Sequence, residues 1–227
     1  MEKERIAEML SDAVERAARK IGISPDDAAI DCLGAYAEEL VRWNRAYNLV
    51  GRKIGEDGIV SLIIDSITPL SFKGLLTDQK EVLDIGSGAG LPGIPLYLLA
   101  GPFSLRLVES QRKRITFLRH IRRCLDLKQV TIYAGRFEDM ARAEDNLNEF
   151  DLAFARAVSN PFKILKQAKP LMSQGGRIVL FVGKNDAESL RKASIDLEKT
   201  GGLRIEGIKS TERIVGKEHF LAVAAKL

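Results

Sequence analysis

The chain has few of the residues on which several kinds of functional site depend. Its 227 residues include two cysteines, Cys32 and Cys124, and two histidines, His120 and His219. Two cysteines cannot form a disulfide framework or a metal cluster, and we interpret them as packing residues in a reducing compartment. Two histidines leave little room for a metal site or a Ser–His–Asp triad. We therefore expect no bound metal and no catalytic histidine, with His120 facing solvent and His219 in a structural role.

Long apolar runs are also missing. The longest uncharged run, from Ile85 to Leu105, is broken by five glycines and three prolines, and the mean hydropathy is −0.07. No segment is therefore expected to span a bilayer. The N-terminal residues 1–5 are mostly charged and lead into no apolar segment, so we expect no secretory signal. With 45% hydrophobic and 29% charged residues, the composition is that of a globular protein, and we expect a cytoplasmic location.

The net charge is only +4, but it is unevenly distributed. Residues 110–128 contain seven basic residues and one acidic residue, a net charge of +6, whereas the rest of the chain is close to neutral. A cationic segment on a near-neutral body is typical of a surface that binds a polyanion such as nucleic acid. The alternative is an ordinary solvated face of a helix.

The first 75 residues are expected to form a helical cap. Apolar residues recur at helical spacing up to Ile21, and Gly22 ends the pattern. Ser24 followed by Pro25 predicts the capping residue and first position of a second helix. A third apolar run is expected to be helical as far as Pro69. We accordingly predict a division into a cap, residues 1–75, and a second domain, residues 76–227.

From residue 81 onward, short apolar strands alternate with amphipathic helices. This alternation predicts an α/β fold with an open, mostly parallel sheet and helices on both faces. Two final strands are separated by too few residues for a crossover helix and should pair as an antiparallel hairpin. The seven expected strands cover residues 81–85, 105–109, 130–134, 150–155, 177–182, 204–208 and 220–225.

A glycine-rich segment, Asp84-Ile85-Gly86-Ser87-Gly88-Ala89-Gly90-Leu91-Pro92-Gly93, follows the first expected strand directly. Glycines at this place permit positive φ angles and let a ligand approach the backbone at the carboxyl end of the strand. The pattern Gly-x-Gly-x-x-Gly within it matches the dinucleotide fingerprint. The acidic-x-Gly-x-Gly-x-Gly pattern is instead typical of pockets for S-adenosylmethionine. Glu109, which ends the second strand, could accept hydrogen bonds from the ribose hydroxyls of either ligand.

The longer segment from Leu83 to Leu96 closely resembles the signature of the glucose-inhibited division protein B family, the ribosomal small-subunit methyltransferase G enzymes. Further segments resemble other motifs of that family, from about Tyr36 to the C-terminus. They are Trp43-Asn44-Arg45-Ala46-Tyr47-Asn48-Leu49, Asp65-Ser66, Lys113-Arg114-Ile115-x-Phe117-Leu118, Gly135-Arg136-Phe137-Glu138, Phe150-Asp151 with Ala155-Arg156-Ala157, and Glu218-His219-Phe220-Leu221.

The resemblance implies a Rossmann-like class I methyltransferase that transfers a methyl group from S-adenosylmethionine to guanine N7 in 16S ribosomal RNA. It implies 16S RNA, or a small-subunit assembly particle, as partner, and we favour a monomer that does not bind membranes. A nicotinamide-dependent oxidoreductase and a non-catalytic RNA-binding protein with a vestigial pocket are the alternatives. No catalytic base is assigned. Together with the loop and strand patterns, the resemblance marks as cofactor-binding residues Gly86, Gly88, Gly90, Leu91, Glu109, Phe137, Glu138 and Arg156.

One segment departs from the family pattern. Ser61 and Leu62 stand where members of the family usually carry an Arg-His pair. If that pair helps to hold RNA, this chain must hold RNA differently. We interpret Trp43, Tyr47 and Leu49 as residues that pack the cap against the sheet rather than as base-stacking platforms.

Overall fold

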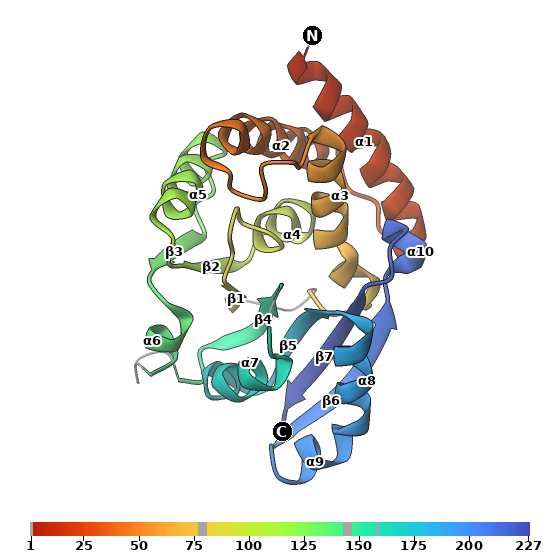
Figure 1. Cartoon of the computed structure of the whole chain (residues 1–227), viewed down its shortest axis with the longest axis vertical. Helices are drawn as coiled ribbons and strands as arrows, with labels where there is room; N and C mark the ends of the chain where they lie inside the picture. The colour runs from red at the N-terminus through yellow and green to blue at the C-terminus, as the bar shows by residue number, and fades with distance from the viewer. Residues whose placement is uncertain (1, 77–80, 143–146, 158) are drawn as a thin grey trace.

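The computed structural model describes residues 2–76, 81–142, 147–157 and 159–227, and Figure 1 shows a sheet with helices on both sides and a helical layer at the N-terminal end. The strands of the sheet are β1 (Glu81–Ile85), β2 (Ser104–Glu109), β3 (Val130–Ala134), β4 (Phe150–Ala155), β5 (Met172–Val182), β6 (Leu203–Ser210) and β7 (Phe220–Lys226). The helices are α1 (Glu2–Ile21), α2 (Asp27–Tyr47), α3 (Glu56–Ser66), α4 (Gly93–Ala100), α5 (Arg112–Cys124), α6 (Phe137–Arg142), α7 (Pro161–Ala168), α8 (Lys184–Lys192), α9 (Ser194–Lys199) and α10 (Glu212–Val215).

The seven strands lie in the order β3-β2-β1-β4-β5-β7-β6. Strands β1 to β5 run parallel, and β7 pairs antiparallel with both β5 and β6. The predicted fold class and the antiparallel pairing of the last two strands are therefore confirmed. Strand β1 has β2 on one side and β4 on the other, so the strand order reverses there. In open α/β sheets, the crevice outside the carboxyl ends of the strands at such a reversal is the usual place for a ligand.

Alternation along the strands separates two apolar clusters. Val82 of β1 belongs to the cluster beneath α1 to α5, whereas its neighbour Leu83 belongs to the cluster beneath α6 to α8. Successive side chains of a strand point to opposite faces, so a sheet covered on both sides buries nearly every strand residue. This explains why β4, Phe-Asp-Leu-Ala-Phe-Ala, appears in the sequence as an almost continuous apolar run.

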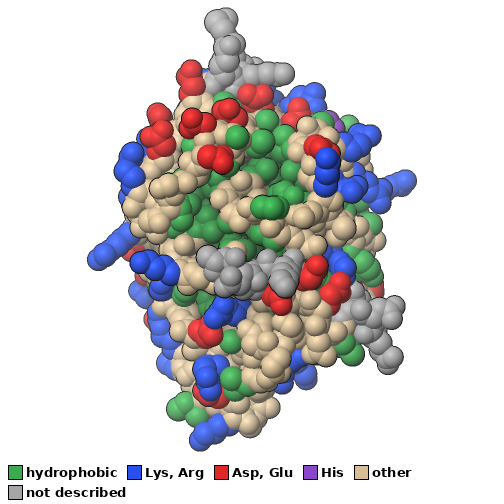
Figure 2. All heavy atoms as spheres, turned by 180° about the vertical axis from the view of Figure 1, so that it is seen from behind, with side chains coloured by type: hydrophobic (Ala, Val, Ile, Leu, Met, Phe, Trp, Pro, Cys, Tyr) green, Lys and Arg blue, Asp and Glu red, His purple; other side chains and the backbone are tan. Residues whose placement is uncertain are grey.

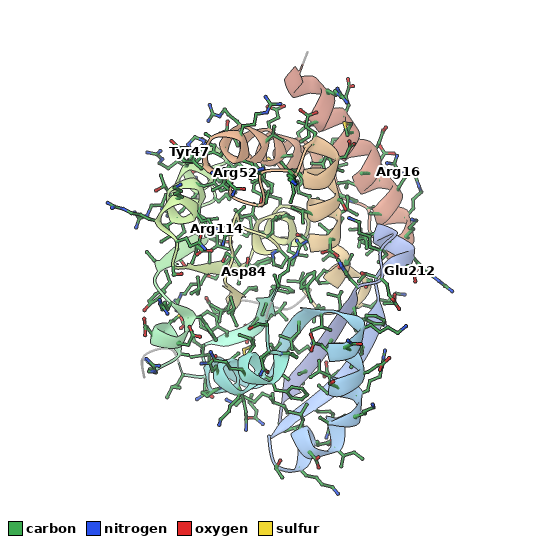
Figure 3. The ribbon with its side chains drawn as sticks, in the orientation of Figure 1. Arg16, Tyr47, Arg52, Asp84, Arg114 and Glu212 are labelled. Carbon is green, nitrogen blue, oxygen red and sulfur yellow. The ribbon has the colours of Figure 1, made fainter. Side chains whose placement is uncertain are left out.

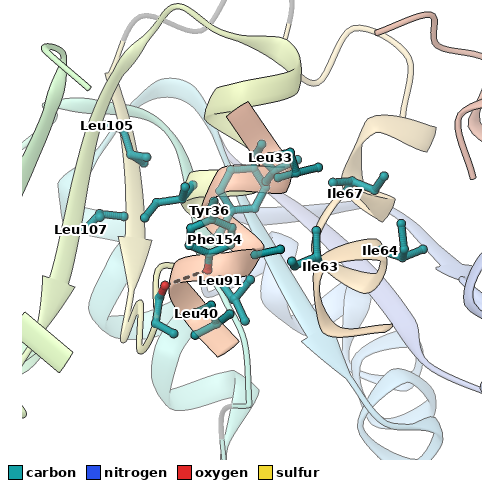
Figure 4. Packing of buried hydrophobic residues seen from close by; sticks show 14 of the residues in the cluster. Leu33, Tyr36, Leu40, Ile63, Ile64, Ile67, Leu91, Leu105, Leu107 and Phe154 are labelled. Atoms are coloured by element: carbon teal, nitrogen blue, oxygen red, sulfur yellow. Dashed lines mark hydrogen bonds between the residues drawn. The ribbon is translucent and has the colours of Figure 1, made fainter. Parts of the chain in front are cut away.

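The helical cap packs onto the sheet through a second layer of helices. Helices α2 and α3 both contact α4, and α2 also contacts α5. Tyr36 of α2 is fully buried in this layer and its hydroxyl donates a hydrogen bond of 2.8 Å to the carbonyl of Ala89 (Figure 4). One apolar cluster thus runs from the cap to the sheet. The predicted division of the chain at residue 75 stays a prediction.

Two helix boundaries differ from those expected. Helix α2 is capped by Asp26, whose side chain accepts a 2.7 Å hydrogen bond from the amide of Ala29, so the predicted cap at Ser24 is wrong. Pro25 consequently precedes the helix. Helix α3 ends at Ser66, and a short 3₁₀ helix, Thr68–Ser71, follows it. Pro69 has no backbone amide to donate to the Asp65 carbonyl, which accepts a 2.7 Å hydrogen bond from the Thr68 hydroxyl instead, and this accounts for a break before Pro69.

Three single-residue expectations are corrected by the packing of α2 against α5. Cys32 and Cys124 are exposed rather than packed, because each lies beside the buried stripe of its helix. His120 does not face solvent: its side chain is 19% exposed and its Nε2 lies 2.6 Å from the Glu39 carboxylate. Figure 2, seen from behind, shows Lys and Arg side chains gathered along the edge where α5 lies.

Candidate functional site

The glycine-rich loop after β1 turns back over the end of β2. Gly86, Gly88 and Gly90 have φ angles of 70°, 57° and 91°, in the left-handed region that favours glycine. Ser87 fastens the loop, since its amide donates a 2.9 Å hydrogen bond to the carbonyl of Val108. The loop therefore brings its backbone to the carboxyl ends of two adjacent strands.

A buried carboxyl group supports this loop from below. Asp84 is fully buried, and its Oδ2 accepts a 2.9 Å hydrogen bond from the amide of Gly93. Burial raises the pKa of Asp84 to about 7, although the Gly93 amide and the charge of Arg156 act in the opposite direction. A Cβ atom at position 93 would lie 2.7 Å from Oδ2. Glycine at this position is therefore what lets the carboxyl group reach the amide.

The same contact bears on the dinucleotide alternative. Helix α4 begins at Gly93, and a dinucleotide would place its pyrophosphate on the free amides of such a helix N-terminus. Here the Gly93 amide already donates to Asp84. The arrangement favours a ligand without a diphosphate.

Glu109, at the end of β2, ties the glycine loop to the start of α5. Its carboxylate accepts hydrogen bonds from the amides of Gly88 at 2.9 Å, Ser110 at 2.7 Å and Gln111 at 2.8 Å. The Arg114 guanidinium lies 3.7 Å away. A carboxylate offers about four acceptor positions, so roughly one remains for a ligand hydroxyl. Glu109 consequently shapes the loop as well as facing the cleft.

Arg156, just beyond β4, connects this end of the sheet to the cap. Its Nη2 lies 2.8 Å from Oδ2 of Asp65, and its Nη1 donates to the Ser66 hydroxyl at 2.9 Å and to the Leu62 carbonyl at 3.1 Å. The side chains of Arg156 and Asp65 are only 16% and 8% exposed. The guanidinium is therefore held in one orientation by α3.

Two adjoining cavities lie over the carboxyl ends of the parallel strands. One has a volume of about 410 Å³ and the other about 250 Å³, and a small-molecule site typically measures about 300–1,000 Å³. Asp84 and Arg114 mark this region in Figure 3. The two cavities share four lining residues, so we treat them as one cleft. The shared residues are Gly86, Arg114, Arg156 and Ala157.

The larger cavity is bounded by the start of α6. Phe137 is almost buried and packs into the apolar cluster on that face of the sheet. Glu138 forms an ion pair of 3.2 Å with Lys163 of α7. A hydrogen bond from its own backbone amide, and then Lys163, hold the pKa of Glu138 below its usual value. This carboxylate thus stays ionised at the rim of the cleft.

The structure brings seven of the eight sequence-predicted cofactor residues to this cleft. Gly90 does not line it: a Cβ at that position would meet Ile94 at 2.8 Å and Leu118 at 3.2 Å, so Gly90 lets the loop pack closely on α4 and α5. The binding roles of all eight stay predictions. The seven that line the cleft are Gly86, Gly88, Leu91, Glu109, Phe137, Glu138 and Arg156.

Other residues of the cleft were not singled out from the sequence. Arg114 belongs to the basic segment, for which the sequence predicts contacts with RNA. In the structure its Nε instead donates a 3.2 Å hydrogen bond to the Leu49 carbonyl at the cleft wall. Leu62, which stands at a departure from the family pattern, lines the smaller cavity. Ser61 faces a separate groove beside α1. No periodicity in the sequence marks these positions, because the cap brings them to the sheet.

The histidines lie away from the cleft. Neither His120 nor His219 lines either cavity, and His219 is half exposed with its Nδ1 3.6 Å from Oδ1 of Asp65. Over the described ranges of the chain, no group of three or more His, Cys, Asp or Glu side chains is placed to hold a metal ion.

A side chain at position 86 should block the cleft without disturbing the fold. A Cβ there would meet no atom within 4 Å, and asparagine tolerates a φ of 70° better than most residues. We expect Gly86→Asn to weaken S-adenosylmethionine binding by at least about tenfold, or ~1.4 kcal/mol, in a calorimetric titration.

Gly175→Asn is the matched control for this prediction. Gly175 has a φ of 74° and equally open surroundings, but it lies in β5 outside the cleft. Both variants should unfold at similar denaturant concentrations. Donor affinity that is equal in the two folded variants would show that the glycine loop does not hold the donor.

Comparison with known proteins identifies related sequences and folds. The family model described as rRNA small subunit methyltransferase G matches residues 29–214. Two relatives are named ribosomal RNA small subunit methyltransferase G. The protein from Oenococcus oeni is 36% identical over an alignment that covers 74% of this chain and 69% of that protein. The protein from Alkaliphilus oremlandii is 30% identical over 96% of this chain and 91% of that protein.

Solved structures share the fold at low sequence identity. A SAM-dependent methyltransferase from Aquifex aeolicus superposes with a TM-score of 0.56 at 20% identity, covering 85% of this chain and 98% of that one. M. jannaschii TYW2 in complex with AdoMet gives a TM-score of 0.53 at 16% identity, covering 73% and 74%. The architecture is that of the Rossmann-like methyltransferases.

Proposed function

Because the chain belongs to the rRNA small subunit methyltransferase G family, we propose that it transfers the methyl group of S-adenosylmethionine to N7 of a guanine in 16S ribosomal RNA. The observation that carries this proposal is the cleft formed by the glycine loop, Glu109 and Arg156 at the carboxyl ends of the parallel strands. Its position at the reversal of strand order is the usual one for a nucleoside ligand.

The residues of the cleft fit the parts of the donor. Gly86 offers open space beside the backbone, where a nucleoside can approach closely. Glu109 keeps acceptor capacity for a ribose hydroxyl. Phe137 and Glu138, at the start of α6, line the larger cavity, and we propose that they flank the adenine. Bound S-adenosylmethionine supplies a methyl group made electrophilic by its sulfonium centre.

The remaining task of the protein is alignment rather than proton transfer. Guanine N7 carries an in-plane lone pair, so it needs no base to remove a proton before it reacts. Holding two reactants in line lowers a barrier by roughly 7–11 kcal/mol. Arg156 is permanently cationic and cannot act as a base, but its guanidinium can donate hydrogen bonds to guanine O6. The positions of both histidines outside the cleft are consistent with this mechanism.

The partner and location follow from the same proposal. An RNA substrate is consistent with the cations of α5, and we propose 16S RNA or a small-subunit assembly particle, modified in the cytoplasm by a monomer. Within the described part of the chain, no helix is long and apolar enough to cross a membrane. The oxidoreductase is less favoured because Asp84 occupies the first amide of α4. A vestigial pocket is less favoured because the cleft is open and lined by charged groups.

The proposal is tested by incubating the protein with labelled S-adenosylmethionine and a 16S RNA transcript, and in parallel with small-subunit particles. Digestion of the RNA to nucleosides should yield labelled 7-methylguanosine. Calorimetric titration with S-adenosylmethionine and with NAD separates the alternatives. Label in another nucleoside, or binding of NAD alone, would refute the proposed reaction. Binding of RNA without any binding of donor would indicate a vestigial pocket.

A further inference from the structure

An exposed aromatic ring stands at the end of α2, although we expected it to pack between cap and sheet. Tyr47 is 46% exposed, so the packing interpretation is wrong for this residue, whereas Leu49 is buried as expected. The Tyr47 ring centroid lies 5.1 Å from that of Trp43, which in turn lies 5.6 Å from that of buried Phe117. Tyr47 is therefore the outer member of a cluster of tilted aromatic rings that is anchored in the core.

Cationic side chains lie on the two segments next to this aromatic cluster, the loop after α2 and helix α5. Arg52 and Lys53 follow α2, and α5 carries further cations on its exposed face. Within the described residues none of these cations forms an ion pair, in contrast to Arg42 and Arg45, which are paired with Glu39 and Glu56. Unpaired cations keep their charge available to a phosphate backbone. The exposed cations of α5 are Arg112, Lys113, Arg119, Arg122 and Arg123.

The aromatic cluster is close to the cleft along the chain. Tyr47 is followed by Asn48, in the left-handed conformation, and then by Leu49 and Val50, which line the smaller cavity. Two residues of chain span at most about 7 Å, so the Cα of Tyr47 lies within about that distance of the Cα of Leu49. Arg114 holds this end of the cavity wall through its hydrogen bond to the Leu49 carbonyl. In Figure 3, Tyr47, Arg52 and Arg114 follow one another from α2 toward the cleft.

From these observations we propose that Tyr47 is a stacking platform for an unstacked RNA base that flanks the target guanine. The proposal rests on the proposed function and adds a specific subsite to it. One side of the ring is supported by Trp43, and the exposed side can receive a base, as aromatic residues do in proteins that bind single-stranded RNA. The neighbouring cations hold the backbone on either side of that base.

The surroundings favour RNA over a protein partner. A protein interface would be expected to extend the apolar surface around an exposed aromatic residue. The other exposed large hydrophobic residues of the described chain belong to other parts of the fold, at or beyond residue 147. Tyr47 is thus a single aromatic group among cations, which matches the chemistry of a nucleotide. If RNA affinity did not depend on the Tyr47 ring, a protein partner would be the better explanation of its exposure.

The test compares Tyr47→Leu with Tyr47→Trp. Leucine keeps an apolar side chain without a π-face, and tryptophan keeps the π-face. We expect Tyr47→Leu to weaken binding of a short guanine-containing single-stranded oligoribonucleotide by roughly 5- to 150-fold, the range for loss of one base–aromatic stack. Tyr47→Trp should bind at least as tightly as the wild type. Both variants should bind S-adenosylmethionine normally, since Tyr47 does not line the cleft.

The salt dependence of RNA affinity distinguishes the contribution of base stacking from that of the cationic side chains. Replacing Arg119 and Arg122 together by alanine should reduce the slope of log affinity against log salt by about 0.7 for each phosphate that the variant no longer neutralises. Tyr47→Leu should instead lower affinity by the same factor at every salt concentration. The fluorescence of Trp43, the single tryptophan, reports on the same place and should change with RNA in the wild type and much less in Tyr47→Leu.

Different results would refute the stacking platform and the proposed function. Wild-type and Tyr47→Leu proteins that bind RNA equally, while both transfer methyl groups to 16S RNA, would overturn the stacking platform alone. A wild-type protein that neither binds RNA nor methylates it would overturn the proposed function. A reduced affinity in Tyr47→Trp equal to that of Tyr47→Leu would also overturn stacking, because the π-face is retained in that variant.

Discussion

Replacing Asp65 by alanine is expected to destabilise the protein by about 3–5 kcal/mol, because it leaves a largely buried guanidinium without its carboxylate. The Arg156–Asp65 pair is 2.8 Å apart, and both side chains are mostly shielded from water. Urea unfolding of the variant and the wild type measures the difference. Single-turnover methyl transfer should fall as well, since Arg156 lines the cleft and loses its fixed orientation.

An exposed ion pair provides the control for this result. Glu198 pairs with Arg204 at 2.8 Å, but both side chains are about half exposed, and Glu198→Ala should cost less than about 1 kcal/mol. Changing Arg156 to methionine in the Asp65→Ala background should recover part of the stability, because no charge is then left buried. If Asp65→Ala and Glu198→Ala lower the free energy of unfolding equally, burial does not strengthen the Arg156–Asp65 ion pair.

Replacing Asp84 by asparagine is expected to remove a large pH dependence of stability. Burial raises the pKa of Asp84 from 3.8 to about 7 in the folded protein. Between these values the folded state binds more protons than the unfolded state, so the free energy of unfolding falls as pH rises. The stabilisation that the proton on Asp84 provides is complete below pH 4 and is lost progressively up to pH 7. Its size is on the order of 4 kcal/mol.

Asparagine keeps the shape of the side chain and the acceptor for the Gly93 amide, but it does not titrate. The stability of Asp84→Asn minus that of the wild type should therefore rise between pH 4 and 7 and then level off. Urea unfolding across this range measures the difference. Asp126→Asn, at an exposed acid whose carboxylate lies 3.2 Å from the Lys128 ammonium, should instead follow the wild type in parallel. A parallel curve for Asp84→Asn would mean that the folded protein does not hold this proton.

The strands could be predicted closely because local sequence determines them. A strand buried on both faces, such as β4, is an apolar run. Strands β1, β3 and β4 span the expected residues. Strand β5 begins at Met172, five residues before the expected start. The glycines at 175 and 176 lie within this added part of β5, whose pairing with β4 shifts register near Phe150.

The site could be predicted only where one segment of chain builds it. The glycine loop and Glu109 stand at the ends of consecutive strands, so their proximity follows from the strand pattern. The partners of Arg156 could not be foreseen in this way, because Asp65 reaches it only through the packing of α3. The exposure of Tyr47 could not be foreseen for a related reason. The buried positions of α2 end at Asn44, so the last residues of the helix, 45–47, are exposed although the helix continues.

The packing of the cap has a consequence for synthesis of the chain. Helices α2 and α3 bury apolar residues against α4, and α2 also packs on α5, which ends 58 residues after α3, at Cys124 rather than Ser66. At about 5–20 residues per second, roughly 3–12 s separate completion of the cap helices from completion of α5. During that interval the apolar stripe of α2 has no native cover on this side. The nascent N-terminal helices must therefore wait at the ribosome, exposed to chaperones, until the first two βα units emerge and give them a surface on which to fold.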